Sequence, residues 1–154
     1  MIQVSFYHLT RTPLEKALPK LLEKVLDKGE RAVVLSPVDF LKRLDDSLWT
    51  YRPDGFLPHG VKRDGHVVDH PIWLTDTLEN PNQSCYLFVT GGLPLPSLDK
   101  FTHCLYVFDS NMPTELQEAR MSWKTAKDYE SPRYWKQTEK GAWEEQEIAA
   151  KETP

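Results

Sequence analysis

The hydrophobic residues of the first half of the chain change spacing at regular intervals. A short β-prone run at residues 4–9 is followed by leucine, alanine and valine at helical spacing over residues 14–26. A β-branched run at residues 32–35 and a second helical pattern at residues 40–48 repeat this order. Strand, helix, strand and helix in succession predict an α/β fold with an open, largely parallel sheet.

The first predicted helix has recognisable ends. Thr12 and Pro13 supply an N-cap and a proline suited to the first helical turn, and Gly29 is placed as the C-cap. Pro19 lies inside the helical pattern, where it indicates a kink or a later start of the helix.

The second half of the chain continues the alternation after a long segment rich in proline and glycine at residues 50–71. The remaining predicted elements are strands within 71–76, 84–92 and 102–111, a helix from Thr114 to about Tyr129 and a final strand at 133–138. We expect one α/β domain over residues 1–143, followed by a charged C-terminal tail at residues 144–154 that frays.

Composition and charge narrow the function classes. The chain has 154 residues, of which 40% are apolar and 27% charged, so it is long enough for a self-supporting core. The formal net charge of −4 argues against nucleic-acid binding by the chain as a whole, so any positively charged binding surface must be a local patch.

Cys85 and Cys104 lie in apolar runs, which indicates reduced core thiols. The N-terminus reads as a strand and no apolar run reaches the roughly 20 residues of a membrane span, so we expect a cytoplasmic protein.

Histidines gather in the long loop, where His59, His66, Asp69 and His70 lie close together in the sequence. Imidazole and carboxylate groups are ligands for zinc and for non-haem metals. Their spacing here matches no compact metal motif, so we expect solvent-exposed loop histidines, no metal and no cofactor.

Signals of enzymatic chemistry are weak as well. The chain has neither G-x-x-x-x-G-K-[ST] nor G-x-G-x-x-G after its first strand, so no nucleotide-binding loop is expected. No G-x-S-x-G occurs, and neither cysteine has an activating neighbour in the sequence. Ser36 and Asp109 follow predicted strands, but residues at such positions cap helices more often than they catalyse.

The predicted helix after Pro113 carries a stripe of cations. Arg120, Lys124 and Lys127 stand at i, i+4 and i+7, beside an apolar face formed by Leu116, Ala119, Trp123 and Ala126. On charge alone a solvated helix face is the simpler interpretation, because acidic residues of the same segment (Glu115, Glu118 and Asp128) partly cancel the positive electrostatic potential of the cations. The alternative is recognition of an acidic, carboxylate-bearing partner.

Several motifs together resemble the chi subunit family of bacterial DNA polymerase III. The stretch "LDDSLWTYRPDGFLPHG" is similar to the family pattern L-D-x-x-L-W, a spacer, and then S-F-x-P-H. The closing "YWKQTEKGAW" is similar to Y-W-x-Q-x-x-x-G-W-x. Weaker likenesses lie in "VSFYHL", "PIWLT", "LYVFD" and "EARMSWKTAK", so that the resemblance covers nearly the whole chain.

The resemblance implies a Rossmann-like three-layer α/β/α fold with a mostly parallel sheet and no nucleotide chemistry. It also implies a non-catalytic subunit of the replisome, working in the cytoplasm at the nucleoid. Such a subunit binds the acidic C-terminal tail of single-stranded-DNA-binding protein, and binds the psi subunit, which connects it to the clamp loader; contact with DNA is indirect.

By the same resemblance, Trp49 and Phe56 would line the pocket for the terminal rings of the tail, and Arg120 would meet its terminal carboxylate. Trp123 takes the place of a family aromatic, Lys124 follows it, and Lys127 would compensate for a basic residue that is missing near Leu116. His59 belongs to the F-x-P-H motif, where we expect it to hold the loop by hydrogen bonds.

Two other function classes stay open. The first is an enzyme acting on a small molecule or a nucleotide, which the absent glycine-rich loop argues against. The second is direct binding of single-stranded DNA by aromatic stacking and cations, which the acidic balance of the chain argues against.

Overall fold

The computed structural model describes residues 2–50, 59–61, 70–127, 129 and 132–146. In chain order the elements are β1 (Gln3–Leu9), α1 (Leu14–Asp27), β2 (Ala32–Leu35), α2 (Val38–Trp49), β3 (Ile72–Thr75), β4 (Tyr86–Val89), β5 (His103–Asp109), α3 (Pro113–Ala126), β6 (Arg133–Gln137) and β7 (Trp143–Gln146). The elements expected from the sequence are therefore present, and α3 ends before the predicted boundary at Tyr129.

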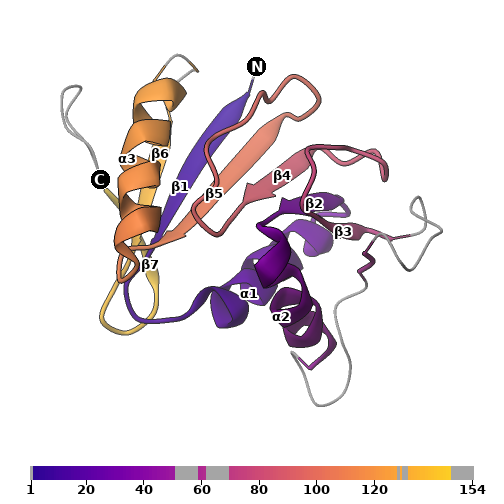
Figure 1. The fold of residues 1–154 in the computed structure, drawn as a ribbon, viewed down its shortest axis with the longest axis horizontal. Coiled ribbons are helices and arrows are strands. Elements are labelled where there is room, and N and C mark those ends of the chain that lie inside the picture. Colours follow the sequence, from indigo (N-terminus) through magenta and orange to yellow (C-terminus); the bar gives the residue numbers. More distant parts are fainter. Residues whose placement is uncertain (1, 51–58, 62–69, 128, 130–131, 147–154) are drawn as a thin grey trace.

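Seven strands form one sheet in the order β3-β2-β4-β5-β1-β6-β7 (Figure 1). Neighbouring strands are parallel throughout, except that β7 pairs antiparallel with β6. The prediction of a mostly parallel sheet is confirmed. The sequence did not predict β7, which carries the sheet to Gln146, beyond the expected start of the tail at residue 144.

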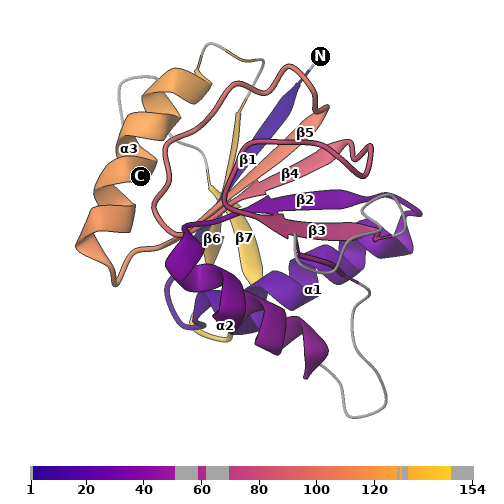
Figure 2. The same cartoon turned by 45° about the vertical axis from the view of Figure 1, so that its right-hand side comes forward.

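The sheet is the middle of three layers. Helix α3 covers one face, and α1 with α2 covers the other, as Figure 2 shows with the sheet nearly on edge. Alternate side chains of each strand point to opposite faces. Thus Val4 and Phe6 of β1 belong to the core beneath α3, whereas Leu9 belongs to the core beneath α1 and α2. The expected three-layer α/β/α architecture is confirmed.

Helix α1 runs through Pro19 without ending there. A proline at this position lacks the N–H that would donate to the carbonyl of Glu15, four residues earlier. The hydroxyl of Ser47, on α2, donates a hydrogen bond to that Glu15 carbonyl instead. At the other end the C-cap is Lys28, one residue before the predicted Gly29. Gly29 follows it with a φ of 75° and donates its N–H to the carbonyl of Leu26.

The side chain of Gln137 fastens the end of β6 to the loop between β1 and α1. Its Oε1 accepts hydrogen bonds from the backbone N–H groups of Thr10, Arg11 and Thr12 at 3.3, 2.9 and 3.0 Å. Its Nε2 donates to the Thr12 hydroxyl at 2.7 Å. The prediction of Thr12 as the N-cap is wrong: the N-cap position is Pro13, without a side-chain cap, and the Thr12 hydroxyl instead accepts the hydrogen bond of Gln137.

The two cysteines differ in their surroundings. Cys104 is fully buried in β5, and this burial raises the pKa of its thiol above the ordinary range. Cys85 is exposed, so the prediction that both are core thiols is wrong for Cys85. It lies just before β4 begins, outside the part of the apolar run that enters the core.

No helix in the described part of the chain is both long enough and apolar enough to cross a membrane.

Candidate protein-interaction surfaces

Helix α3 presents two distinct faces. Its inner face buries Ala119, Trp123 and Ala126, as the helical spacing predicted, together with Ser122; the predicted Leu116 is only half-buried. Its outer face carries Arg120, Lys124 and Lys127, all of them exposed. Because these three follow one another at helical spacing, they form a continuous basic surface, here called the α3 stripe.

The acidic residues of α3 oppose the stripe less than the sequence suggested. Glu115 is buried, and its carboxylate accepts a hydrogen bond from the backbone N–H of Asp109 at 3.2 Å. Burial raises the pKa of Glu115, against the opposing effect of that hydrogen bond. Glu118 is half-buried, and Asp128 lies outside the described residues. Among the described residues, Glu118 therefore remains partly exposed on α3, whereas Glu115 faces the core.

Trp123 is a core residue. Only 4% of it is exposed, and its ring lies edge-on to Phe6 at 5.1 Å and to Tyr134 at 5.8 Å between ring centroids. The expectation that Trp123 lines a partner site beside the stripe therefore needs correction. The apolar face of α3 turns toward the sheet, and a tryptophan in that face is covered by β1 and β6.

Tyr134, which packs beneath α3, is hydrogen-bonded to a buried histidine. Its hydroxyl and the Nδ1 of His8 are hydrogen-bonded, and burial raises the pKa of Tyr134 while the positive charge of Arg120 opposes this rise. Burial and the nearby Lys136 lower the pKa of His8 to about 4, while Asp109 acts in the opposite direction. Neutral His8 is thus the form that the folded protein favours at physiological pH.

Trp49 is the last residue of α2. Besides Trp123, it is the aromatic residue expected at the partner site that the structure describes. It is 51% exposed, and its ring lies edge-on to the imidazole of His59 at 5.3 Å. His59 is buried, and its Nε2 lies 2.6 Å from Oδ1 of Asp45, which is also buried. The expectation that His59 holds the loop by hydrogen bonding is confirmed.

An apolar cavity of about 300 Å³ opens beside α2, bounded by described residues that include Val38, Leu41, Val61 and Leu74. Three charged residues, Lys42, Asp45 and Asp76, also line it. The cavity and Trp49 lie on the same layer of the protein, and Asp45 connects them through His59.

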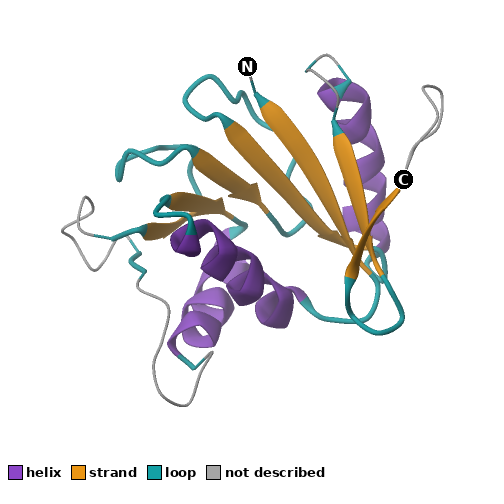
Figure 3. Cartoon of the chain, turned by 180° about the vertical axis from the view of Figure 1, so that it is seen from behind, coloured by secondary structure: helices purple, strands orange, loops and turns teal. Residues whose placement is uncertain are grey.

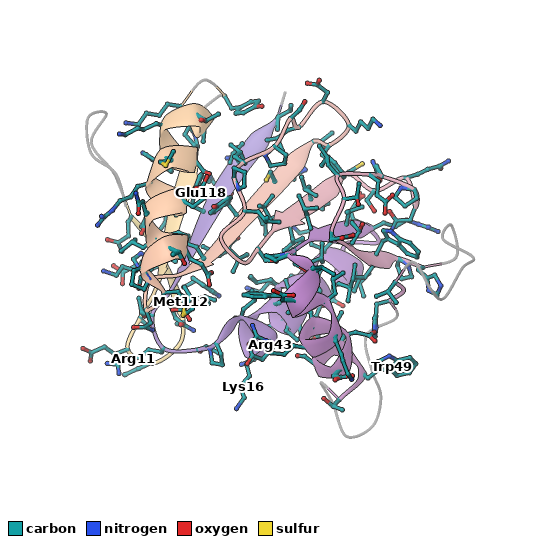
Figure 4. The ribbon with its side chains drawn as sticks, in the orientation of Figure 1. Arg11, Lys16, Arg43, Trp49, Met112 and Glu118 are labelled. Carbon is teal, nitrogen blue, oxygen red and sulfur yellow. The ribbon has the colours of Figure 1, made fainter. Side chains whose placement is uncertain are left out.

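The α3 stripe and Trp49 lie on opposite sides of the sheet. In Figure 4, Trp49 is at the far end of α2, well separated from the α3 residues Met112 and Glu118. The buried residues of α2 and α3 also belong to different cores. The single pocket expected from Trp49 and Arg120 is therefore not assembled by the described residues. Phe56, the other expected ring, lies outside them.

The candidate metal and catalytic residues have structural contacts. The expectation of solvent-exposed loop histidines is wrong for His59, which is buried and pairs with Asp45; His70 is half-buried, and His66 and Asp69 lie outside the described residues. Within the described ranges no group of three or more His, Cys, Asp or Glu side chains could hold a metal ion. Ser36 donates its hydroxyl to the carbonyl of Pro37, and Asp109 accepts the backbone N–H of Asn111. These last two contacts are those of turn residues.

Sequence reasoning missed two residues that organise these surfaces, Asp45 and Gln137. Both lie in the motifs "LDDSLW" and "YWKQ". The signal was that Asp45 and Gln137 stand at the D of L-D-x-x-L-W and the Q of Y-W-x-Q, the patterns to which these motifs are similar. Each proves to be a buried polar group that fastens one segment to another.

Comparison with known proteins gives a consistent result. A family model described as "DNA polymerase III chi subunit, HolC" matches residues 1–132. A protein of Rickettsia prowazekii (strain Madrid E), described as a probable DNA polymerase III subunit chi, is 32% identical over 109 residues. That match covers 70% of this chain and 66% of the relative, slightly less than two thirds of the relative's length.

Proposed function

The chain belongs to the DNA polymerase III chi subunit family, and we propose that it is a non-catalytic accessory subunit that binds the acidic C-terminal tail of single-stranded-DNA-binding protein. The α3 stripe is the observation that carries this proposal. In this function the chain joins single-stranded-DNA-binding protein to the rest of the holoenzyme during replication in the bacterial cytoplasm.

The stripe suits an acidic tail because three exposed cations stand in a row on a chain of net charge −4. Lys124 and Lys127 would attract the carboxylates of an acidic segment and speed its arrival, an effect that salt weakens. Arg120 would bind the terminal carboxylate, since the planar guanidinium matches two carboxylate oxygens at once. Trp123 would contribute by packing beneath the helix, without touching the tail.

A second surface would serve another subunit of the holoenzyme. The cavity beside α2 is largely apolar, and Trp49 lies exposed on the same layer. Lys42 lines the cavity together with Asp76 and with Asp45, which pairs with His59, so the lining offers no concentrated positive charge for an acidic tail, and its apolar side chains favour an apolar segment. We assign this surface to a psi subunit or to the clamp loader, and assign Trp49 to it in place of the tail site.

The test is fluorescence anisotropy of a labelled acidic peptide that ends in Asp-Ile-Pro-Phe, titrated with the full chain at two salt concentrations. Micromolar binding that weakens with salt is expected. Arg120→Glu should weaken it by about tenfold or more, because one charge-assisted contact becomes a repulsion. Lys100→Glu changes the same charge at an exposed loop position and is the matched control.

Two further arms separate the alternatives. Trp49→Ala should leave peptide binding unchanged; loss of binding in this variant would instead place the tail beside α2. If Arg120 meets the terminal carboxylate, a peptide amidated at its C-terminus should bind the wild-type chain more weakly than the free-acid peptide does. It should bind Arg120→Glu no more weakly than the free-acid peptide does, because amidation removes the repulsion. Absence of binding at high micromolar protein would contradict the proposed function. Stabilisation by a nucleotide or another small molecule in a thermal-shift screen would then favour an enzyme.

A further inference from the structure

One half of the sheet lacks a helix on the side where α1 lies. Helix α2 packs beside β3 and α1 packs beside β5, whereas β1 and β6 have no helix in front of them when the sheet is viewed from behind (Figure 3). A cavity of about 430 Å³ lies here between this part of the sheet and the side of α1. We call this region the β1–β6 face; the residues used to define it are Lys24, Lys28, Tyr7, Tyr86, His103, Arg133 and Trp135.

Flat rings line the β1–β6 face in two stacked pairs. Tyr7 and Trp135 lie side by side on β1 and β6, with ring centroids 6.3 Å apart and planes only 8° from parallel. Tyr86 and His103 stack at 4.4 Å with planes 7° apart, on the neighbouring strands β4 and β5. All four rings are half-buried, so each is fixed by its neighbours yet keeps part of its surface open to solvent.

Three cations lie near these rings, together with two carboxylates, Glu30 near His103 and Glu145 near Tyr7. Lys24 projects from the last turn of α1, Lys28 from its C-cap, and Arg133 from the start of β6. All three side chains are exposed. The ammonium of Lys28 lies 5.9 Å from the centroid of the Tyr86 ring, within the range of a cation–π contact. Glu145 lies 3.8 Å from Arg133, a distance at which an exposed ion pair stabilises little.

We propose that the β1–β6 face binds a segment of single-stranded nucleic acid, with bases stacked on the aromatic pairs and phosphates beside Lys24, Lys28 and Arg133. Stacking needs the flat face of a base, which a duplex hides within its own stack. The cations supply the complementary charge for a polyanion, although the chain as a whole is acidic. A protein partner is the weaker fit, because charged side chains are depleted at the centre of protein interfaces.

The site is independent of the proposed tail contact. The stripe residues Arg120, Lys124 and Lys127 lie on α3, which covers the opposite face of the sheet. A variant of one surface should therefore leave binding at the other unchanged, so failure of either proposal can be recognised separately.

The first experiment measures binding of a labelled oligo(dT) of about 12 nucleotides to the full chain at low salt. Lys24→Glu combined with Lys28→Glu should weaken binding by about tenfold or more, since two phosphate contacts are replaced by repulsion. Lys16→Glu combined with Lys100→Glu is the matched control, because it changes the same total charge at exposed positions that do not line the cavity. Equal weakening by both pairs would overturn the proposal, because it would show a response to net charge alone.

The second experiment tests stacking. Trp135→Leu should weaken oligo(dT) binding several-fold, whereas Trp135→Phe should retain most of it, since the phenyl ring still offers a flat face. Thermal unfolding of both variants separates a loss of fold from a loss of stacking. Equal binding by the Leu and Phe variants would overturn the role of the ring. A duplex of the same length that binds as tightly as oligo(dT), or no binding at tens of micromolar protein, would overturn the proposal as a whole.

Discussion

The imidazole of His59 and the carboxylate of Asp45 lie 2.6 Å apart, both buried, although 14 residues separate them in the chain. Asp45 belongs to α2, and His59 is the first of the described residues 59–61, which lie beside β3. Gly60, next to His59, exchanges backbone hydrogen bonds with Ile72 and Leu74 of β3. The pair therefore fixes the connection between α2 and the edge of the sheet.

His59→Ala should lower the free energy of unfolding by about 1–3 kcal/mol, because it leaves the buried Asp45 carboxylate without this partner. Urea denaturation followed by circular dichroism measures the change. Asp46→Asn, at the next position, is the control, since Asp46 is exposed and its pair with Lys42 is a surface contact. We expect that control to cost less than about 0.5 kcal/mol. Equal effects of the two substitutions would contradict a structural role for the buried pair.

Pro19 and Ser47 should be energetically coupled through the carbonyl of Glu15. Ser47→Ala should destabilise the protein by about 1–2 kcal/mol, since that carbonyl then lacks both the helical N–H and the hydroxyl. In a Pro19→Ala background the restored N–H can satisfy the carbonyl, so the cost of Ser47→Ala should become smaller. Denaturation of the four proteins of this cycle gives the coupling. Strict additivity would show that Ser47 does not substitute for the missing helical hydrogen bond.

The order and type of most elements could be predicted from the sequence because each has a strong local signal. The helical spacing in residues 14–26, with Gly29 after it, suffices to place α1. Strand β7 has no such signal: half of "WEEQ" is charged, and the segment is a strand because β6 offers it an unpaired edge. Burial of single residues was harder to predict, as Cys85 shows.

The candidate site was less predictable than the fold. Helical spacing correctly placed Arg120 and its stripe on the outside of α3 and assigned Trp123 to the apolar face. Helical spacing does not tell which face of the sheet a helix covers. The family resemblance placed Trp49 and Arg120 in one pocket, whereas α2 and α3 lie on opposite sides of the sheet. Topology, which depends on long-range strand order, decides that question.

Gln137 should contribute more to stability than its single polar side chain suggests. Gln137→Ala removes the acceptor of three backbone N–H groups and the donor to Thr12. We expect a loss of about 2–3 kcal/mol, which lowers the melting temperature by roughly 4–12 °C for a chain of this size. Gln117→Ala, at an exposed position of α3, is the control and should leave the melting temperature nearly unchanged. A similar small effect for Gln137→Ala would show that water replaces the amide without cost.

His8 should make stability depend on pH between about 4 and 6.5. Its folded pKa, lowered mainly by burial to about 4, lies below the ordinary value of about 6.5 that applies in the unfolded chain. Between these values the unfolded state binds more protons, so stability falls as pH decreases, by at most about 1.4 kcal/mol per pH unit from this group. Urea denaturation from pH 4.5 to 7 should show a smaller slope for His8→Phe than for the wild type. Tyr134→Phe, which removes the hydroxyl bonded to His8, should keep the slope, because burial is the main cause of the shift. An unchanged slope in His8→Phe would assign the pH dependence to other groups.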